Sequence, residues 1–169
     1  MKYLIVIDMQ NDFIDGALGT EEAARIVPAV IEKIKGFNGP VLATRDTHGG
    51  DYLETKEGKA LPVPHCIRDT QGWALHRDIA PLLSTTPFDK TAFGSWELCE
   101  YMRSLRQTPE EIVLVGLCTD ICVISNALML KAALPDTTVT VDSACCAGVT
   151  PQSHQNALEA MRACQVNVV

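Results

Sequence analysis

The chain lacks several features that mark particular classes of protein. No apolar run approaches the roughly 18 residues that a membrane-spanning helix requires, so we expect no membrane partner. Aromatic residues make up only 5%, the formal net charge is −7 and no basic patch is visible, which argues against a nucleic-acid partner. The amino terminus enters an apolar segment without the pattern of a signal peptide, and we therefore expect a cytoplasmic protein.

The seven cysteines also lack the spacing of a disulfide framework. Cys118 and Cys122 are separated by three residues and Cys145 and Cys146 are adjacent, so none of these pairs forms the C-x-x-C unit of a zinc ribbon. An odd number of scattered thiols is typical of a reducing compartment, which again indicates the cytoplasm. Neither Ser nor His stands at a position that would indicate a serine triad.

What the chain does contain is a regular alternation of apolar strands and amphipathic helices. Strands are expected at residues 3–9, 40–46, 87–91, 111–117, 138–144 and 166–169, and helices at 20–35, 76–83, 95–105, 121–134 and 153–164. Parallel strands need helical crossovers, so this order predicts an α/β three-layer sandwich with a mostly parallel six-stranded sheet. The 169 residues, 1–169, suit a single domain.

Three reactive side chains come at the ends of three expected strands. Asp8 ends the first strand, Lys90 ends a short one, and Cys122 lies in the first helical turn after the strand at 111–117. Open α/β sheets bind their ligands at the carboxyl ends of the strands, so these groups can meet there. Each also has an ordinary interpretation, as a turn-capping Asp, an exposed Lys and a buried Cys.

Together the three side chains offer a chemistry that none of them has alone. A free thiol has a pKa of about 8.5 and is mostly protonated at neutral pH. A nearby ammonium favours the thiolate, and a carboxylate can take the thiol proton and hand it to a leaving amine. The backbone N–H groups of Cys118 and Cys122 can stabilise the resulting oxyanion. This combination predicts a cysteine nucleophile.

The motifs carrying these residues are Asp8-x-Gln10-Asn11-Asp12-Phe13, Lys90 and Gly116-Leu-Cys-Thr119-Asp120-x-Cys122-Val123. They resemble the isochorismatase-like cysteine hydrolases, which include nicotinamidases, N-carbamoylsarcosine amidases and isochorismatases, and the likeness covers nearly the whole chain. The resemblance implies a catalytic triad of Asp8, Lys90 and Cys122 and a cis peptide bond between Leu117 and Cys118. It also implies hydrolysis of a carbon–nitrogen bond of a small amide through a thioester, in a homo-oligomer that is a dimer or a tetramer.

A second group of residues follows the expected strand at 40–46. Asp46 and His48 come at its end, and His65 lies on a returning loop, so the three can form a carboxylate–imidazole metal site. The resemblance implies the nicotinamidase metal site at these residues, with zinc, manganese or iron as the divalent ion and no organic cofactor.

The segment between His48 and His65 departs from the nicotinamidase pattern. It lacks a further His after His48, and Pro62 stands where a substrate-stacking Trp is often found. Two possibilities stay open: Asp51 or Glu54 supplies an oxygen ligand, or no metal binds. Because residues 47–75 show little periodicity, we expect this long segment to be functional and to set the substrate specificity.

The remaining assignments are simpler. Phe13 and Phe93 are expected to line the substrate pocket, and Trp73 and Trp96 to pack in the interior. Cys66, Cys99 and Cys164 are interpreted as structural, and His76 and His154 as caps or solvent-facing residues.

Two other functions remain compatible with the sequence. One is hydrolysis of a non-amide substrate, such as a vinyl ether of the isochorismate type, without a metal. The other is a non-catalytic relative, including a redox sensor in which Cys118 and Cys122 form a disulfide under mild oxidation.

Overall fold

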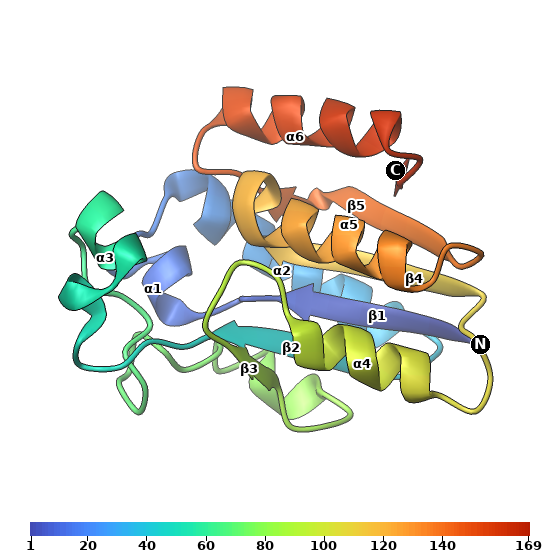
Figure 1. Ribbon diagram of the computed structural model, residues 1–169, viewed down its shortest axis with the longest axis horizontal. Coiled ribbons are helices and arrows are strands. Elements are labelled where there is room, and N and C mark those ends of the chain that lie inside the picture. Colours follow the sequence, from blue (N-terminus) through green and yellow to red (C-terminus); the bar gives the residue numbers. More distant parts are fainter.

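The computed structural model describes residues 1–169 and is built on one six-stranded sheet (Figure 1). The strands are β1 (Lys2–Ile7), β2 (Val41–Asp46), β3 (Phe88–Lys90), β4 (Glu111–Leu117), β5 (Thr138–Ala147) and β6 (Asn167–Val168). Their order is β3-β2-β1-β4-β5-β6, and every neighbouring pair is parallel. The predicted α/β class and parallel sheet are confirmed.

The chain begins in the middle of the sheet, builds one half outward and then returns to build the other. The strand order therefore reverses between β1 and β4. The connections that leave these two strands diverge, which opens a crevice at their carboxyl ends. Asp8 directly follows β1, and the segment carrying Cys122 directly follows β4, so both belong to this crevice.

The helices are α1 (Asn11–Ile14), α2 (Glu21–Gly36), α3 (Lys56–Ala60), α4 (Trp96–Ser104), α5 (Ile124–Ala133) and α6 (Pro151–Ala163). Helix α2 packs on one face of the sheet, and α4, α5 and α6 cover the other (Figure 1). Alternating side chains of β1 serve the two cores: Leu4 and Val6 pack with α2, whereas Ile5 and Ile7 pack with the other three helices. None of the six helices has the length and apolar character needed to span a membrane.

Helix α2 shows how the sequence determines a boundary. The Thr20 hydroxyl accepts a hydrogen bond from the Ala23 amide and so caps the helix. The buried side chains recur at helical spacing and face the sheet; they are Ala23, Ile26, Val27, Val30 and Ile34. This side of the three-layer sandwich therefore forms as predicted.

Several elements differ from the prediction. The expected helix at 76–83 is reduced to a single 3₁₀ turn, Ala80–Leu82, where Pro81 supplies no N–H. Strand β5 continues to Ala147 across a register shift opposite β4, so Cys145 and Cys146 lie inside the strand instead of after it. Trp96, expected to pack in the interior, is 74% exposed.

Candidate active site

The structure brings Asp8, Lys90 and Cys122 together in the crevice. The Lys90 Nζ lies 2.7 Å from Asp8 Oδ2 and 3.5 Å from Cys122 Sγ, so the ammonium contacts both of the other groups. All three residues are buried, with exposures of 0%, 4% and 5%. A carboxylate, an ammonium and a thiol that are far apart along the chain are thus brought into contact through Lys90.

Burial and mutual contact shift the proton affinities of these three groups. Burial raises the pKa of the Asp8 carboxyl, and the Lys90 charge offsets this only in part. For Lys90, burial opposes the charged form, but the Asp8 and Cys122 partners outweigh it and raise its pKa. Burial and then the Asp8 charge raise the pKa of Cys122 well above the ordinary range, against the lowering effect of Lys90. The Lys90 charge therefore acts to lower the pKa of the thiol but does not outweigh the effect of burial.

Asp8 is oriented so that one carboxylate oxygen stays available. The Thr44 hydroxyl donates a 2.6 Å hydrogen bond to Asp8 Oδ1. The buried Oδ2 makes no hydrogen bond beyond its ion pair with Lys90. A buried carboxylate oxygen with so few partners is free to accept a further proton or hydrogen bond.

The turn that carries Cys122 has an unusual backbone. The Leu117–Cys118 peptide bond is cis, as the resemblance implied, and a π-helical turn, Thr119–Val123, leads directly into α5. The Cys118 carbonyl accepts from the Ile121 and Val123 amides, whereas the Cys118 N–H has no acceptor within the chain. A donor left free beside the nucleophile is what an oxyanion requires.

Asn126 is a residue of this region that the sequence analysis missed. Its side-chain amide donates to the carbonyl oxygens of Cys122 and Phe93, and its Oδ1 accepts from the Ser95 amide. It therefore ties the nucleophile turn to the segment that follows Lys90. An Asn one helical turn after a reactive Cys is a weak signal, and only the fold reveals this contact.

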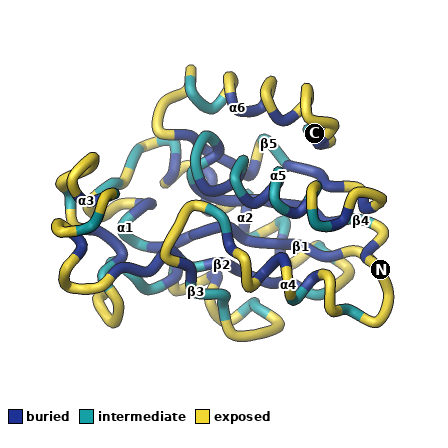
Figure 2. The backbone as a smooth tube through the Cα atoms, viewed as in Figure 1, coloured by how far each residue is buried: buried dark blue, intermediate teal, exposed yellow.

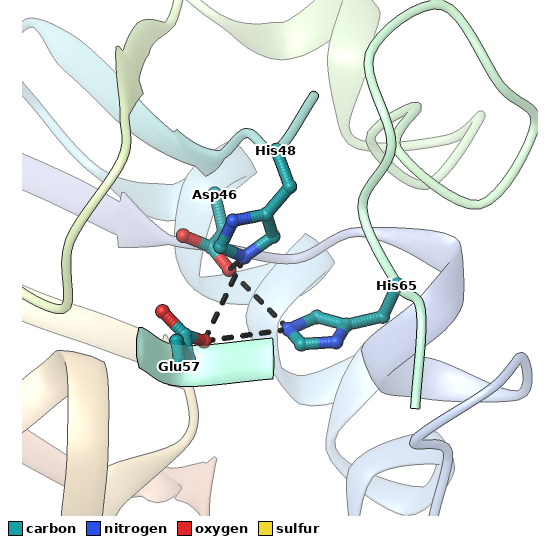
Figure 3. Close-up of side chains that lie close together, drawn as sticks. All are labelled: Asp46, His48, Glu57 and His65. Atoms are coloured by element: carbon teal, nitrogen blue, oxygen red, sulfur yellow. Dashed lines mark hydrogen bonds and ion pairs between the residues drawn. The ribbon is translucent and has the colours of Figure 1, made fainter. Parts of the chain in front are cut away.

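Four side chains next to the triad form a cluster with the donor set of a metal site (Figure 3). Asp46, His48, Glu57 and His65 each offer one ligand atom, and these atoms lie within 4.8 Å of one another. Asp46 Oδ2 is 3.0 Å from His48 Nε2 and 3.7 Å from His65 Nε2. Two imidazoles with two carboxylates suit zinc, manganese or iron, so the residues fit the expected ion.

The acidic partner in this cluster is Glu57, in place of the two candidates considered from the sequence. Asp51 and Glu54 are exposed and lie outside the group. Glu57 is carried by α3, a short helix that Thr55 caps by accepting from the Gly58 amide. A helix of five residues has too little periodicity to be recognised in the sequence, so α3 was not predicted.

Tyr52 and Val63 hold the two imidazoles in place. The buried Tyr52 ring lies 4.7 Å from the His48 ring and 5.0 Å from the His65 ring, edge to face. The Val63 carbonyl is 2.8 Å from His65 Nδ1, which leaves Nε2 to point at Asp46 and Glu57. Such support of the second ring nitrogen is typical of histidines that bind metals.

Asp46 belongs to both groups. Its Oδ1 lies 3.2 Å from Lys90 Nζ, while its Oδ2 faces His48 and His65. Burial alone would raise the pKa of Asp46, but its contacts with the two histidines and with Lys90 outweigh burial and lower it. The triad and the four-residue cluster are therefore joined through one carboxylate.

A cavity of about 180 Å³ lies between the two groups. Cys118, Ile121 and Cys122 form one wall, and Asp46, Glu57 and His65 form another; Phe13, Leu18, Ala60, Leu61 and Phe93 complete the lining. Phe13 and Phe93, which were expected to line a substrate pocket, both line this cavity, and the Phe13 ring lies 5.5 Å from the His65 ring. Leu61 and Leu18 were not singled out from the sequence.

Comparison with known proteins agrees with this geometry. The family model described as the isochorismatase domain matches residues 2–169. The chain belongs to the isochorismatase family. A nicotinamidase/pyrazinamidase of Mycobacterium tuberculosis is 30% identical to it over 186 residues, which cover 100% of this chain and 98% of that relative.

Solved structures of similar proteins share the same fold. The pyrazinamidase/nicotinamidase of Streptococcus mutans superposes with a TM-score of 0.86 at 25% identity, over 100% of both chains. The pyrazinamidase of Pyrococcus horikoshii, determined in complex with zinc, gives a TM-score of 0.81 at 27% identity, over 99% of this chain and 98% of the other. The predicted isochorismatase-like fold and the family resemblance are confirmed, and the relatives support a hydrolase that acts on an amide.

Proposed function

We propose that this isochorismatase-family protein hydrolyses the carbon–nitrogen bond of a small amide through a thioester on Cys122. The observation that carries the proposal is the contact of Lys90 with both Asp8 and Cys122, the latter in the lining of a mostly apolar cavity. Similar proteins of named activity are nicotinamidases and pyrazinamidases, which favours the amide over a vinyl ether.

In the proposed reaction, Asp8 takes the proton of the Cys122 thiol as Sγ attacks the carbonyl carbon of the amide. The raised pKa of Asp8 fits this role, because a more basic carboxylate accepts a thiol proton more readily. The N–H groups of Cys118 and Cys122 donate to the developing oxyanion. Asp8 then passes its proton to the departing nitrogen, and ammonia or an amine leaves.

The second half of the reaction releases the acid. Water attacks the thioester carbonyl while Asp8 accepts its proton, and the Cys122 thiol leaves with that proton. Lys90 keeps a positive charge beside both groups throughout, because its own pKa is raised by them. Its charge stabilises the negative charge that Asp8 and Cys122 carry in turn in this buried site.

Asp46, His48, Glu57 and His65 are proposed to hold a divalent ion. Bound there, the ion supplies a Lewis-acidic position in the cavity wall for a nitrogen or oxygen atom of the substrate or of water. The chain's own contribution is to orient the imidazoles through Tyr52 and Val63. The cavity, of about 180 Å³ and mostly apolar, suits a compact neutral amide.

Three broader features complete the proposal. Residues 1–169 act as one catalytic domain, in a homo-oligomer. We place the protein in the cytoplasm, a setting that fits seven cysteines that are all free of disulfides.

The proposal is tested by measuring ammonia released from a panel of small amides that includes nicotinamide, with and without added zinc or manganese. Cys122→Ala should abolish release from every amide, because it removes the thiol that Lys90 contacts. Cys164→Ala, which removes an exposed free thiol far along the chain, is the matched control and should release ammonia at the wild-type rate.

Ammonia release that survives in folded Cys122→Ala would contradict the mechanism. Trapping the intermediate gives an independent readout, because acid-quenched enzyme should carry the acyl group on Cys122 as a mass increase. If no amide releases ammonia and a vinyl ether is hydrolysed instead, the same residues catalyse the non-amide reaction.

A further inference from the structure

The turn that carries the nucleophile, Thr119–Val123, is held from outside by helix α6 and by the residues just before that helix. Thr119 Oγ1 lies 2.8 Å from His154 Nδ1, and Asp120 Oδ1 accepts a 3.1 Å hydrogen bond from the Val149 amide. Most residues of α6 are exposed, as Figure 2 shows in yellow, whereas His154 is half-buried. His154 was expected to cap a helix or to face solvent; instead it contacts the nucleophile turn.

This support matters because the turn lacks the regular hydrogen bonding of an α-helix. The Cys118 carbonyl accepts from both the Ile121 and the Val123 amides, and no side chain caps the start of the turn. Thr119 is 0% exposed, so its hydroxyl needs a partner within the chain. His154 is that partner.

A glycine allows α6 to approach the turn this closely. Gly148 lies in the connection between β5 and α6. A Cβ atom at this position would lie 2.9 Å from the His154 Cβ and 3.0 Å from Asp120 Oδ1. The space between the helix and the turn therefore has no room for a side chain at Gly148.

The His154 ring is uncharged at neutral pH. Burial lowers the pKa of its imidazole, and the opposing effect of the Asp120 charge is smaller. A neutral imidazole has one ring nitrogen that accepts, so the Thr119 hydroxyl can donate to Nδ1.

We propose that His154 is a positioning residue for the oxyanion hole and acts through Thr119. Thr119 directly follows Cys118, whose N–H donates to the oxyanion in the reaction proposed above, so a fixed Thr119 fixes the direction of that N–H. Loss of the contact leaves the turn free to shift, while Asp8 and Lys90 stay in place at the ends of other strands. This inference rests on the proposed function, because it assigns His154 to the oxyanion step.

The central test is Thr119→Val, which removes the hydroxyl and keeps the shape of the side chain. The kcat for the best substrate of the amide panel should fall about tenfold with KM unchanged, because the oxyanion forms only after the amide has bound. His154→Phe should cause the same fall, and the double variant should lose no more than either single one, since both changes break one contact. Thr119→Ser and His154→Asn keep a hydrogen-bonding atom and should restore most of the activity.

Affinity for an aldehyde analogue of the substrate measures the oxyanion hole directly; for nicotinamide the analogue is pyridine-3-carbaldehyde. Cys122 Sγ adds to the carbonyl carbon, the π electrons of the carbonyl move to its oxygen, and the thiol proton passes through Asp8 to that oxygen. This oxygen takes the place of the oxyanion. Thr119→Val should therefore weaken aldehyde binding by about the same factor as it lowers kcat.

Alkylation of Cys122 by iodoacetamide separates the oxyanion hole from the nucleophile itself. Sγ forms a bond to the methylene carbon, iodide leaves with the bonding electrons, and the thiol proton passes to solvent, so no oxyanion develops. The alkylation rate of Thr119→Val, followed as the mass added to Cys122, should equal that of the wild type.

Thr137→Val is the matched control. Thr137 is 1% exposed, and its hydroxyl donates to the Pro109 carbonyl 2.9 Å away. It directly precedes β5 and so lies at the end of the sheet opposite to the crevice. Like Thr119→Val, this change should lower the midpoint of urea unfolding, but kcat and aldehyde binding should stay at their wild-type values.

Three results would overturn the proposal. The first is a Thr119→Val variant with wild-type kcat and aldehyde affinity, and the second is a kcat that falls together with the alkylation rate. The third is a double variant whose loss is the product of the two single losses.

Failure of the proposed function is a separate result. If the wild type hydrolyses no amide, that function is wrong, whereas aldehyde binding and alkylation still test the contact between His154 and Thr119. A wild type that is alkylated at Cys122 but binds no aldehyde has no oxyanion hole to position, which would also contradict the inference.

Discussion

The triad and the neighbouring four-residue cluster lie on either side of one cavity, but the chain builds them in different ways. Asp8, Lys90 and Cys122 sit at or just after the ends of β1, β3 and β4, so the sheet fixes their positions. In the cluster only Asp46 belongs to a strand, while His48, Glu57 and His65 come from the long segment between β2 and β3. One site is anchored by the core of the fold, and the other depends on a loop that folds against it.

This difference has a physical consequence. Strand ends are held by backbone ladders that cannot shift without disturbing the whole sheet, so the triad geometry is insensitive to changes in the loop. The cluster relies on short-range supports such as Tyr52 and the Thr55 cap of α3. Substitutions should therefore affect the chemistry of the two sites to different extents, and variants can separate them.

The largest effect is expected from Lys90→Met, which removes the charge that the triad shares. Asp8 and Asp46 would be left as two buried carboxylates without their common cation, so we expect a loss of stability of about 3–5 kcal/mol and a fall in kcat of about a thousandfold or more. Urea unfolding and steady-state ammonia release measure the two effects. Unchanged stability would show that the sheet does not depend on this ion pair.

Glu57→Gln should act on the cluster and leave the triad intact. Loss of one anionic ligand should lower the affinity for zinc or manganese about 10–100-fold, as measured by titration with a competing chelator. The control is Glu54→Gln, a change of the same type in an exposed residue outside the cluster, which should bind metal like the wild type. If both variants bind alike, Glu57 is not a ligand.

The pH dependence of kcat/KM reports on Asp8. Because burial raises the pKa of Asp8, its carboxylate becomes protonated, and the base is lost, at a higher pH than for an exposed aspartate. On the acid side of the profile, kcat/KM should therefore fall at a pH above the usual pKa of an aspartate. An acid limb near the ordinary value of about 3.9 would argue against Asp8 as the base.

The smallest effect is expected from Thr44→Val, which removes the hydroxyl that donates to Asp8 Oδ1. That hydrogen bond favours the charged carboxylate, so its loss should move the acid limb of the same profile to higher pH by about one unit or less. Thr44→Ser keeps the hydroxyl and should restore the wild-type limb. A shift in the opposite direction would mean that the hydroxyl does not stabilise the carboxylate.

The same contrast explains how much could be predicted from the sequence. Strands such as β1 and β4 are short apolar runs, and the reactive residues at or shortly after the strand ends predicted the triad. Glu57 could not be found in this way, because its approach to His65 depends on how a loop with little periodicity folds. The interior packing predicted for Trp96 was wrong, since the apolar character of one residue does not say whether the fold covers it.

Backbone irregularities are the second kind of feature that could not be predicted from the sequence. The π-helical turn at Thr119–Val123 and the register shift opposite β5 are local departures that no side-chain pattern specifies. The cis peptide bond at Leu117–Cys118 was expected only through the family resemblance. Trp73, by contrast, packs as expected, with the Arg45 guanidinium 3.5 Å above its ring.

The carboxylate of Asp46 couples the triad to the four-residue cluster, because it contacts both. A change of charge near His48 and His65 acts on Asp46 Oδ2 and therefore alters the interaction of Asp46 Oδ1 with Lys90. Thermodynamic reciprocity then requires that acylation of Cys122 alter the affinity for an ion by the same factor by which the ion alters acylation. An ion at the cluster and an acyl group on Cys122 are thus two ligands of one coupled site, and each is expected to change the affinity for the other.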